Sequence, residues 1–462
     1  MEHNKGKFNS NFGFLMAALG SAVGLGNLWS FPYKLGMNCG FAFLLIYVVL
    51  CVVVGYPLVL SEIALGRKTG RAAIDAYAAI DKRFTFNGVL QTIVPFLLIC
   101  FYCTFGGYIL KYLVASVANL FGGAGGLAEA GSYFGGFTND VPQALAYMLL
   151  FLVMTVLVVL GGVSGGIEKF CKYAMPALFV MLVAIVIRAC TLQGSAGGLA
   201  FLFKPDFSGM STLNGFYNIL SAAGGQMFFS LSLASACLIA YGSYLGKGEN
   251  LVKDATVIVV GDSLVAILAG MAIMPAVFSY GIEPGAGPGL LFVSMTTVFQ
   301  SMGAAGKVFQ LLFWALVFIA ALSSSIGMME GGISSIMDQR IKKGKKASRT
   351  AITLLMGAFA LLGNFLTTAD ALGAGKLTQW FHILGQTDVL NVWDCVAEGV
   401  LMPLGGLIMA VILGWFVPGW IDDEIATGSR FGGRGFYRFC IKYVGPLFML
   451  MIVYGQIRTF WG

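Results

Sequence analysis

The first long apolar segment of the chain is interrupted by residues that a membrane helix tolerates poorly. From Gly20 to Pro32 it reads Gly-Ser-Ala-Val-Gly-Leu-Gly-Asn-Leu-Trp-Ser-Phe-Pro. Glycine costs about 1 kcal/mol in a helix interior and proline about 3, so a helix that enters this segment is expected to unwind. In hydrocarbon an unwound backbone is tolerated only where it faces protein or a water-filled cavity. The segment therefore predicts a place where backbone groups bind an ion or a small polar solute.

The composition is that of a membrane protein. Of the residues 58% are hydrophobic and 11% are charged, whereas a soluble domain carries about 25% charged residues. A window of about 20 apolar residues per crossing gives segments at 12 to 33, 41 to 65, 88 to 118, 141 to 163, 170 to 190, 214 to 245, 255 to 281, 306 to 337, 350 to 367, 391 to 417 and 438 to 460. We expect an all-α polytopic protein with one transmembrane domain over residues 1–462.

The basic residues predict the orientation, because loops rich in Lys and Arg stay in the cytoplasm. A cytoplasmic N-terminus gathers most of them on one side, including the run from Arg340 to Arg349. The odd number of crossings then puts the C-terminus outside. We interpret the net charge of +7 as a determinant of topology. The expected partner of the basic run is the lipid bilayer, and no nucleic acid is expected.

The sixth segment repeats the peculiarity of the first. Residues 224–246 carry Ser230, Ser232 and Ser235 between apolar flanks. Five crossings separate the two interruptions, so a repeat of five helices would place them in inverted orientation about a common centre, as in many transporters. The expected repeats are residues 12–190 and 214–417, with an extra helix at 438–460.

Three more polar features lie in apolar segments. The run Ser323 to Ser325 follows Ala320 in the eighth segment. A single serine usually bonds its own helix, but at least one of three in succession must face away, and hydroxyl oxygens suit a hard cation such as sodium. Asp262 is either a protonated or water-facing structural carboxylate or a fixed charge that balances a cation, because an ionised group there costs about 2.5 to 3.5 kcal/mol. Glu62 is expected to pair with a local basic group.

Other chemistry has little support in the sequence. The nine cysteines have no metal-ligand spacing, and there are two histidines. An intramembrane enzyme would need a paired aspartate, a Ser/His arrangement or a metal set. The sequence leaves open whether Cys39 and Cys395 form a disulfide. An ion channel stays a distant alternative, but the sequence has no repeated filter signature, and two asymmetric interruptions favour alternating access.

Three motifs, in this order, resemble one family. The segment quoted above, Gly-Gln-Met-Phe-Phe-Ser-Leu-Ser-Leu from Gly225 and Ala-Leu-Ser-Ser-Ser from Ala321 resemble the neurotransmitter:sodium symporter family. The resemblance covers almost the whole chain, and the eleven-helix layout is similar to a bacterial subgroup that includes tyrosine transporters. It implies the LeuT-like fold with a five-plus-five inverted repeat and discontinuous helices 1 and 6. It also implies a sodium-coupled symporter of the bacterial inner (plasma) membrane, not an enzyme.

The resemblance implies three sites, carried over residue by residue. One sodium site would use Ala22, Asn27 and Ser230, with Asp262 close by or as a direct ligand. A second would use Gly20, Val23, Ala320, Ser323 and Ser324. The substrate site would be lined by Ala22, Gly24, Leu25, Gly26, Tyr102, Phe229, Ser230, Ser232, Ser235, Ser324 and Met328. Two sodium ions are therefore the expected cofactors.

The resemblance also narrows the substrate. Family members that carry monoamines have an aspartate where Gly24 stands, so Gly24 implies an α-amino acid, and Leu25 agrees. Ser235 and Met328 lie at the end of the site that would hold the substrate side chain, and they imply an apolar-to-aromatic amino acid. Tyrosine is the preferred candidate, and a small aliphatic amino acid is the alternative. A permanent carboxylate at Asp262 implies that transport does not require chloride.

The chain departs from the family pattern at the gates. The usual outer arginine and aspartate are replaced by Ser30 and Asn391, which predicts a neutral hydrogen bond or a substitute role for Asp388 or Asp394. At the cytoplasmic end Lys5 is expected to pair with Asp338 as a point charge. Tyr102 and Phe229 would close over the substrate.

Overall fold

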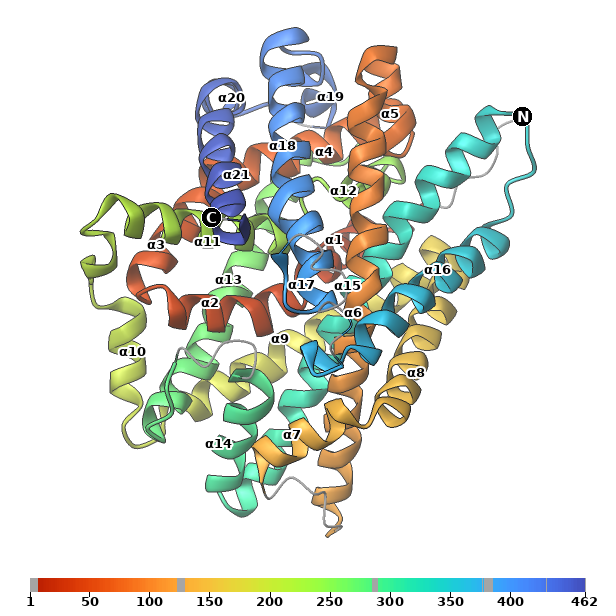
Figure 1. Ribbon diagram of the computed structural model, residues 1–462. Helices are drawn as coiled ribbons and strands as arrows, with labels where there is room; N and C mark the ends of the chain where they lie inside the picture. Colours follow the sequence, from red (N-terminus) through yellow and green to blue (C-terminus); the bar gives the residue numbers. More distant parts are fainter. Residues whose placement is uncertain are drawn as a thin grey trace.

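The computed structural model describes residues 7–122, 129–284, 290–375, 377, 385–428 and 430–461, and throughout these ranges the regular structure is helical. The α-helices are α1 (Asn11–Ala22), α2 (Phe31–Met37), α3 (Phe41–Leu50), α4 (Tyr56–Thr69), α5 (Ala73–Ile80), α6 (Thr85–Leu120), α7 (Ala130–Asn139), α8 (Val141–Leu160), α9 (Lys169–Cys190), α10 (Ser195–Phe203), α11 (Leu213–Ser230), α12 (Cys237–Ser243), α13 (Leu251–Ser279), α14 (Met295–Ser301), α15 (Ala304–Lys342), α16 (Arg349–Ala369), α17 (Val389–Asp394), α18 (Met402–Val411), α19 (Asp422–Thr427), α20 (Arg434–Phe439) and α21 (Gly445–Trp461) (Figure 1). Short π-helical segments continue several of them, at Gly26–Ser30, Cys51–Gly55, Val163–Glu168, Leu290–Ser294, Cys395–Leu401, Ile412–Phe416 and Cys440–Val444.

Nine helical stretches of the described chain are long and apolar enough to cross a membrane. A tenth crossing is the bent pair Asn11–Ala22 and Gly26–Met37, whose halves meet at 45°. The remaining expected crossing, 214 to 245, corresponds to α11 and α12 with the six residues between them. The prediction of an all-α polytopic protein is therefore confirmed.

The first interruption falls where the glycines predict it. Helix α1 stops because Val23 has an extended backbone (φ −73°, ψ 100°), and Val23 and Gly24 separate it from the next helical turn, which begins at Leu25. Pro32 lies where the π-helical turn Gly26–Ser30 passes into α2, and such a turn accommodates a residue that donates no backbone hydrogen bond. The two half-helices thus have ends inside the protein.

The second interruption is made without glycine. Between α11 and α12 the backbone of Ser232, Ala234 and Ala236 has φ of 52°, 53° and 61°. A residue other than glycine held in a sparsely populated backbone region costs on the order of 1 to 3 kcal/mol and persists only when its surroundings impose it. Here the adjacent half-helix is fixed by close backbone packing, since a Cβ on Gly66 of α4 would lie 2.0 Å from the Ile239 carbonyl oxygen of α12.

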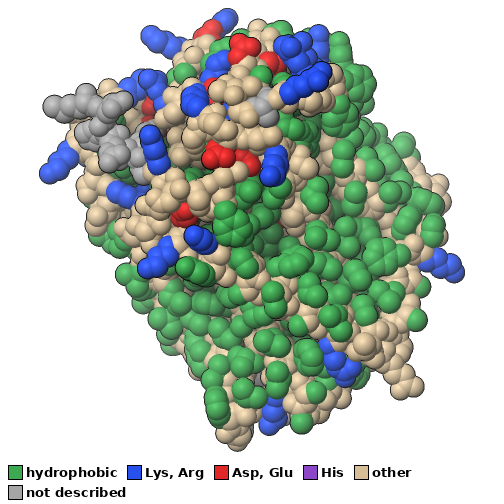
Figure 2. Space-filling model, turned by 180° about the vertical axis from the view of Figure 1, so that it is seen from behind, with side chains coloured by type: hydrophobic (Ala, Val, Ile, Leu, Met, Phe, Trp, Pro, Cys, Tyr) green, Lys and Arg blue, Asp and Glu red, His purple; other side chains and the backbone are tan. Residues whose placement is uncertain are grey.

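Charged side chains gather at one end of the molecule. Figure 2 shows them at the upper end of one face, with hydrophobic side chains over most of the rest. We call this the basic end; it is held by ion pairs such as Arg67 with Glu424, Lys247 with Glu424 and Lys342 with Asp75. Helices α5 and α19 lie at this end, and α7 and α14 lie at the opposite end (Figure 1).

Candidate functional site

The two interruptions meet in the middle of the protein. The Ser232 hydroxyl donates to the Ser21 carbonyl at 2.9 Å, and the Ser21 hydroxyl and the Cys237 thiol share a hydrogen bond at 3.0 Å. The main-chain N–H of Ala234 donates to Glu62 Oε1 at 2.6 Å. Glu62 is fully buried and accepts a hydrogen bond from this backbone amide. None of the ion pairs in the described part of the chain includes Glu62, so the expected pairing with a local basic group is wrong. Its carboxylate supports the strained turn.

Asp262 is the centre of a buried oxygen cluster. Asn27 Nδ2 donates to Asp262 Oδ1 at 2.8 Å and to the Asp262 carbonyl at 3.0 Å. The Ser230 hydroxyl lies 3.0 and 2.9 Å from the two carboxylate oxygens. Tyr47 Oη donates to Oδ2 at 3.2 Å. The structure therefore brings together Asn27, Ser230 and Asp262, three of the four residues assigned to the first sodium site. The fourth, Ala22, is the last residue of α1 and precedes Asn27 in the same interrupted crossing.

The charge of Asp262 is surrounded by neutral groups. Asn27, Ser230 and Tyr47 are all 0% exposed, as is Asp262 itself. Among the described residues no lysine, arginine or histidine forms an ion pair with this carboxylate. Neutral donors stabilise a buried anion less than an opposite charge does. A carboxylate in these surroundings is chemically suited to a small cation.

A second oxygen cluster lies where α1 meets α15. The Ser324 hydroxyl donates to the carbonyls of Gly20 at 3.2 Å and Val23 at 3.4 Å. The Ser323 hydroxyl lies 3.0 Å from the carbonyl of Ala320 in its own helix. A Cβ on Gly20 would lie 3.1 Å from Ser323 Cβ, so both serines border the end of α1. All five residues assigned to the second sodium site meet here.

Backbone amides between these clusters point at hydrogen-bond acceptors. The N–H of Gly24 donates to Asn27 Oδ1 at 3.0 Å, and the N–H of Leu25 donates to Tyr102 Oη at 3.2 Å. Space is tight here, since a Cβ on Gly24 would lie 2.1 Å from Ser324 Oγ and 2.9 Å from Tyr102 Oη. These amides are the donors that a carboxylate could use at the start of a half-helix.

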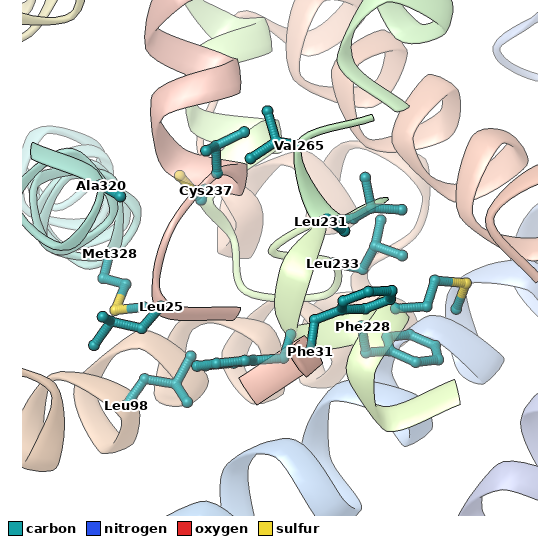
Figure 3. Packing of buried hydrophobic residues seen from close by; sticks show 14 of the residues in the cluster. Leu25, Phe31, Leu98, Phe228, Leu231, Leu233, Cys237, Val265, Ala320 and Met328 are labelled. Atoms are coloured by element: carbon teal, nitrogen blue, oxygen red, sulfur yellow. The ribbon is translucent and has the colours of Figure 1, made fainter. Parts of the chain in front are cut away.

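Apolar side chains form the wall opposite these amides. Met328 of α15 points toward Leu25, and Leu98 of α6 lies below them in Figure 3. The Phe229 ring lies 3.2 Å from the position of a Cβ on Gly26. Ser235 donates to the Ser232 carbonyl at 2.5 Å. Every assigned substrate residue is buried: Ala22, Gly24, Leu25, Gly26, Tyr102, Phe229, Ser230, Ser232, Ser235, Ser324 and Met328.

Contacts of the N-terminal segment and of Asp338 close the path from the site to the basic end. Phe8 packs edge-on against Tyr241 and Tyr244. The N–H of Asn9 donates to Glu168 at 2.7 Å and fixes the chain that leads into α1. Asp338 accepts from the N–H of Ala72 at 2.7 Å. Lys5, the expected partner of Asp338, lies outside the described residues.

At the opposite end Ser30 and Asn391 each form a hydrogen bond, and Asp388, one of the residues expected in a substitute role, takes part in one of them. The Ser30 hydroxyl donates to Gln226 Oε1 at 2.8 Å, and the Asn391 amide donates to Asp388 at 2.6 Å. Each expected gate residue thus has another partner. Asp388 lies just before the membrane-spanning stretch Val389–Phe416. Burial raises the pKa of its carboxyl group, and the hydrogen bonds from Asn391 partly oppose this rise.

Trp29 contributes to the same closure with an aromatic contact. Its ring centroid lies 4.4 Å from that of Phe105 and 5.4 Å from that of Tyr33. Trp29 is only 7% exposed. The substrate region is therefore covered from both ends.

Three residues of the site were missed by sequence reasoning. Tyr47 reaches Asp262, the Gln226 amide donates to the Gly26 carbonyl at 2.7 Å, and Glu62 caps the second interruption. Gln226 lies in a quoted motif and could have been found there. A lone tyrosine in an apolar helix gives no such signal. Cys39 and Cys395 are free thiols, so the disulfide left open is absent.

Two interrupted helices that meet beside buried oxygen clusters define a class, the secondary transporters whose discontinuous helices bind ions and solutes near the bilayer midplane. Residues 5–122 and 138–461 match the model of the Sodium:neurotransmitter symporter family. The chain belongs to this family. It is a sodium-dependent symporter and not an enzyme.

Relatives and a solved structure agree with this assignment. The chain is 36% identical over 454 residues to the uncharacterised sodium-dependent transporter YhdH of Bacillus subtilis, with 96% of each chain covered. It is 32% identical over 457 residues to an uncharacterised sodium-dependent transporter of Haemophilus influenzae, again with 96% of each covered. The crystal structure of MhsT in complex with L-phenylalanine matches with a TM-score of 0.87 at 32% identity and covers 98% of this chain and 100% of MhsT. The expected LeuT-like fold is thereby confirmed.

Proposed function

We propose that this chain carries an α-amino acid together with sodium by alternating access. The observation that carries the proposal is the pair of amides at Gly24 and Leu25, which donate to Asn27 and Tyr102 at the start of a half-helix. Because position 24 has no side chain, an anionic group there would have to come from the substrate. A substrate carboxylate would take these amides as donors.

Two sodium ions account for the two oxygen clusters. The first ion would be bound by Ala22, Asn27 and Ser230 with the substrate carboxylate, and the second by the cluster around Ser324. If substrate and sodium bind each other directly, each raises the affinity of the other by the same factor. Each ion that moves inward through about 100 mV contributes roughly 2.3 kcal/mol, so two would support on the order of a thousandfold gradient of substrate.

Hydrophobic and aromatic amino acids are the proposed substrates, with tyrosine first. The wall formed by Leu25, Phe229 and Met328 is apolar, and the Ser235 hydroxyl is a polar group at its side-chain end. MhsT, with the same fold, was solved with L-phenylalanine bound, which supports this class. A small aliphatic substrate is the alternative, and it would make fewer contacts with the apolar wall.

Chloride independence follows from Asp262. A carboxylate among neutral donors, adjacent to Asn27 and Ser230, supplies the negative charge that a chloride ion would otherwise bring to bound sodium. Transport should therefore continue when chloride is replaced by gluconate.

The proposed location is the bacterial inner (plasma) membrane with the basic end in the cytoplasm. This orientation follows the rule that Lys- and Arg-rich loops stay inside. It places the N-terminus in the cytoplasm and the C-terminus outside. The amino-acid substrate and the surrounding lipid are then the expected partners.

Purified protein in liposomes tests the proposal directly. Uptake of each proteinogenic amino acid is measured with and without an inward sodium gradient, and binding is measured by sodium-dependent thermal stabilisation. We expect saturable, sodium-dependent uptake that is fastest for tyrosine and phenylalanine. Preference for glycine or alanine would support the aliphatic alternative. Large single-channel currents without saturable uptake would replace the carrier by a channel.

A further inference from the structure

An ion pair joins the outer half of the first crossing to the π-helical segment Cys395–Leu401. Lys34 Nζ of α2 lies 2.6 Å from Glu398 Oε1. Lys34 and Glu398 side chains are 17% and 6% exposed, so water screens the pair little. A charge pair shielded in this way is costly to break by removing one partner, because the other is left buried and uncompensated.

Glu398 also touches the outer half of the sixth crossing. A Cβ on Gly225 of α11 would lie 3.2 Å from Glu398 Oε1 and 2.3 Å from Gln456 Nε2. The Gln456 amide in turn donates to the Ser221 carbonyl of α11 at 3.0 Å. The carboxylate is therefore fixed against α2 and α11, the two half-helices that lead away from the interruptions toward the opposite end.

A second carboxylate shares the location. Asp394, one turn before Glu398, lines the same cavity as Glu398 and Lys34. The three charged residues line a cavity of about 480 Å³ together with Tyr33, Asn391 and Gln456. One described cation thus faces two carboxyl groups across the junction between α2 and the tenth crossing, and its removal would leave Glu398 without its ion-pair partner.

We propose that Lys34 and Glu398 form the latch that holds the opposite end of the transporter closed. The inference rests on the proposed alternating access, in which α2 and α11 must separate from the tenth crossing to open a path to the site. The sequence left open a neutral hydrogen bond at Ser30 and Asn391 or a substitute role for Asp388 or Asp394. The latch takes the place of the first, and Asp394 of the second lines the same cavity. Because Lys34 is the one cation that the described part of the chain places beside Glu398 and Asp394, its loss opens this end more than the loss of Glu398, after which Asp394 can still pair with Lys34.

The test measures how fast an external thiol reagent reaches Cys395, a buried native cysteine next to Asp394. A membrane-impermeant reagent is applied to right-side-out vesicles of a variant in which the partly exposed Cys39 and Cys190 are replaced by serine. We expect Lys34→Met to raise the modification rate on the order of tenfold and Glu398→Gln to raise it less. The reversed pair Lys34→Glu with Glu398→Lys should return the rate to within about twofold of the parent.

Lys111→Met is the matched control. Lys111 lies over the rings of Tyr133, Phe137 and Tyr147 and does not touch the tenth crossing through an ion pair, so the rate should stay unchanged. Thermal unfolding checks that each variant is folded. A folded Lys34→Met protein whose rate stays within about twofold of the parent overturns the latch, and so does failure of the reversed pair to restore the rate.

The same vesicles separate this inference from the proposed function. Sodium-dependent amino-acid uptake by the parent is measured alongside. If the parent transports no amino acid, the proposed function fails, whatever the cysteine rates are. If the parent transports and the rates do not respond to Lys34, the latch alone fails.

Discussion

The Ser232 hydroxyl donates to the Ser21 carbonyl at 2.9 Å, across 211 residues of sequence. Ser21 lies in the last turn of α1, and Ser232 lies in the second interruption at φ 52°. The bond joins the two half-helices whose ends form the site. A ligand that moves one interruption must therefore act on the other, which gives a physical basis for coupling between ion and substrate.

Gly24→Ala should abolish efficient uptake. The new Cβ would lie 2.1 Å from Ser324 Oγ and 2.9 Å from Tyr102 Oη, so Ser324 would have to rotate away from the Gly20 and Val23 carbonyls. Overpacking costs about 1 to 3 kcal/mol, which corresponds to roughly a five- to 150-fold loss of affinity. The affinity for tyrosine is measured from its sodium-dependent thermal stabilisation of the purified protein. Gly135→Ala, with nothing within 4 Å, is the control and should behave as wild type; equal affinity in both variants contradicts the packing argument.

Ser324→Ala should weaken sodium dependence, whereas Ser325→Ala should not. Ser324 bonds the Gly20 and Val23 carbonyls, while the Ser325 hydroxyl bonds Thr155 at 2.8 Å, away from α1. We expect the sodium concentration for half-maximal uptake to rise on the order of tenfold, equivalent to about 1.4 kcal/mol, in the first variant. If the sodium concentration for half-maximal uptake rose similarly in both variants, the cause would be destabilisation of the helix and not loss of a sodium ligand.

Asp262→Asn should make transport depend on chloride. The substitution keeps the shape but removes the negative charge beside Asn27 and Ser230. Uptake is measured in chloride and in gluconate media at several sodium concentrations. We expect wild-type uptake to be equal in both media and the variant to lose most activity in gluconate and recover part of it in chloride. Loss of wild-type uptake in gluconate would refute the charge-balance role.

Glu62→Gln and Glu62→Ala should differ in stability. Glutamine keeps an oxygen that can accept from the Ala234 N–H, which Glu62 now does at 2.6 Å, whereas alanine leaves that buried donor unsatisfied at a cost of about 1 to 3 kcal/mol. The midpoint of thermal unfolding in detergent should therefore fall further for alanine. Equal midpoints would show that the carboxylate does not support the turn.

The sequence predicted the features that carry a strong local signal. The glycines between Gly20 and Gly26 and the proline at 32 mark the first interruption because they disfavour helix irrespective of tertiary context. The second interruption was predicted from the serines between apolar flanks in residues 224–246, and the inverted repeat was then inferred from the five crossings that separate the two interruptions. Its positive φ angles at Ser232, Ala234 and Ala236 were not predictable, because tertiary contacts from Glu62 and α4 impose them.

Contacts between distant crossings were the least predictable part. The Lys34 and Glu398 pair depends on the rotation of the tenth crossing, where a π-helical segment at Cys395–Leu401 shifts the register of every later side chain. Asn391 was identified only from its place in the family pattern, and its amide bonds Asp388 within the same turn. Tyr47 reaches Asp262 from an apolar helix in which a single tyrosine has no periodic partner.

The Lys34 and Glu398 ion pair also has a consequence for biogenesis. Its partners are 364 residues apart in the chain, so at a synthesis rate of about 5 to 20 residues per second the lysine reaches the translocon roughly 20 to 70 s before its carboxylate is made. During that time Lys34 must extend toward the lipid headgroups. The nascent first crossing is therefore a vulnerable intermediate, which quality-control proteases could recognise until the tenth crossing arrives.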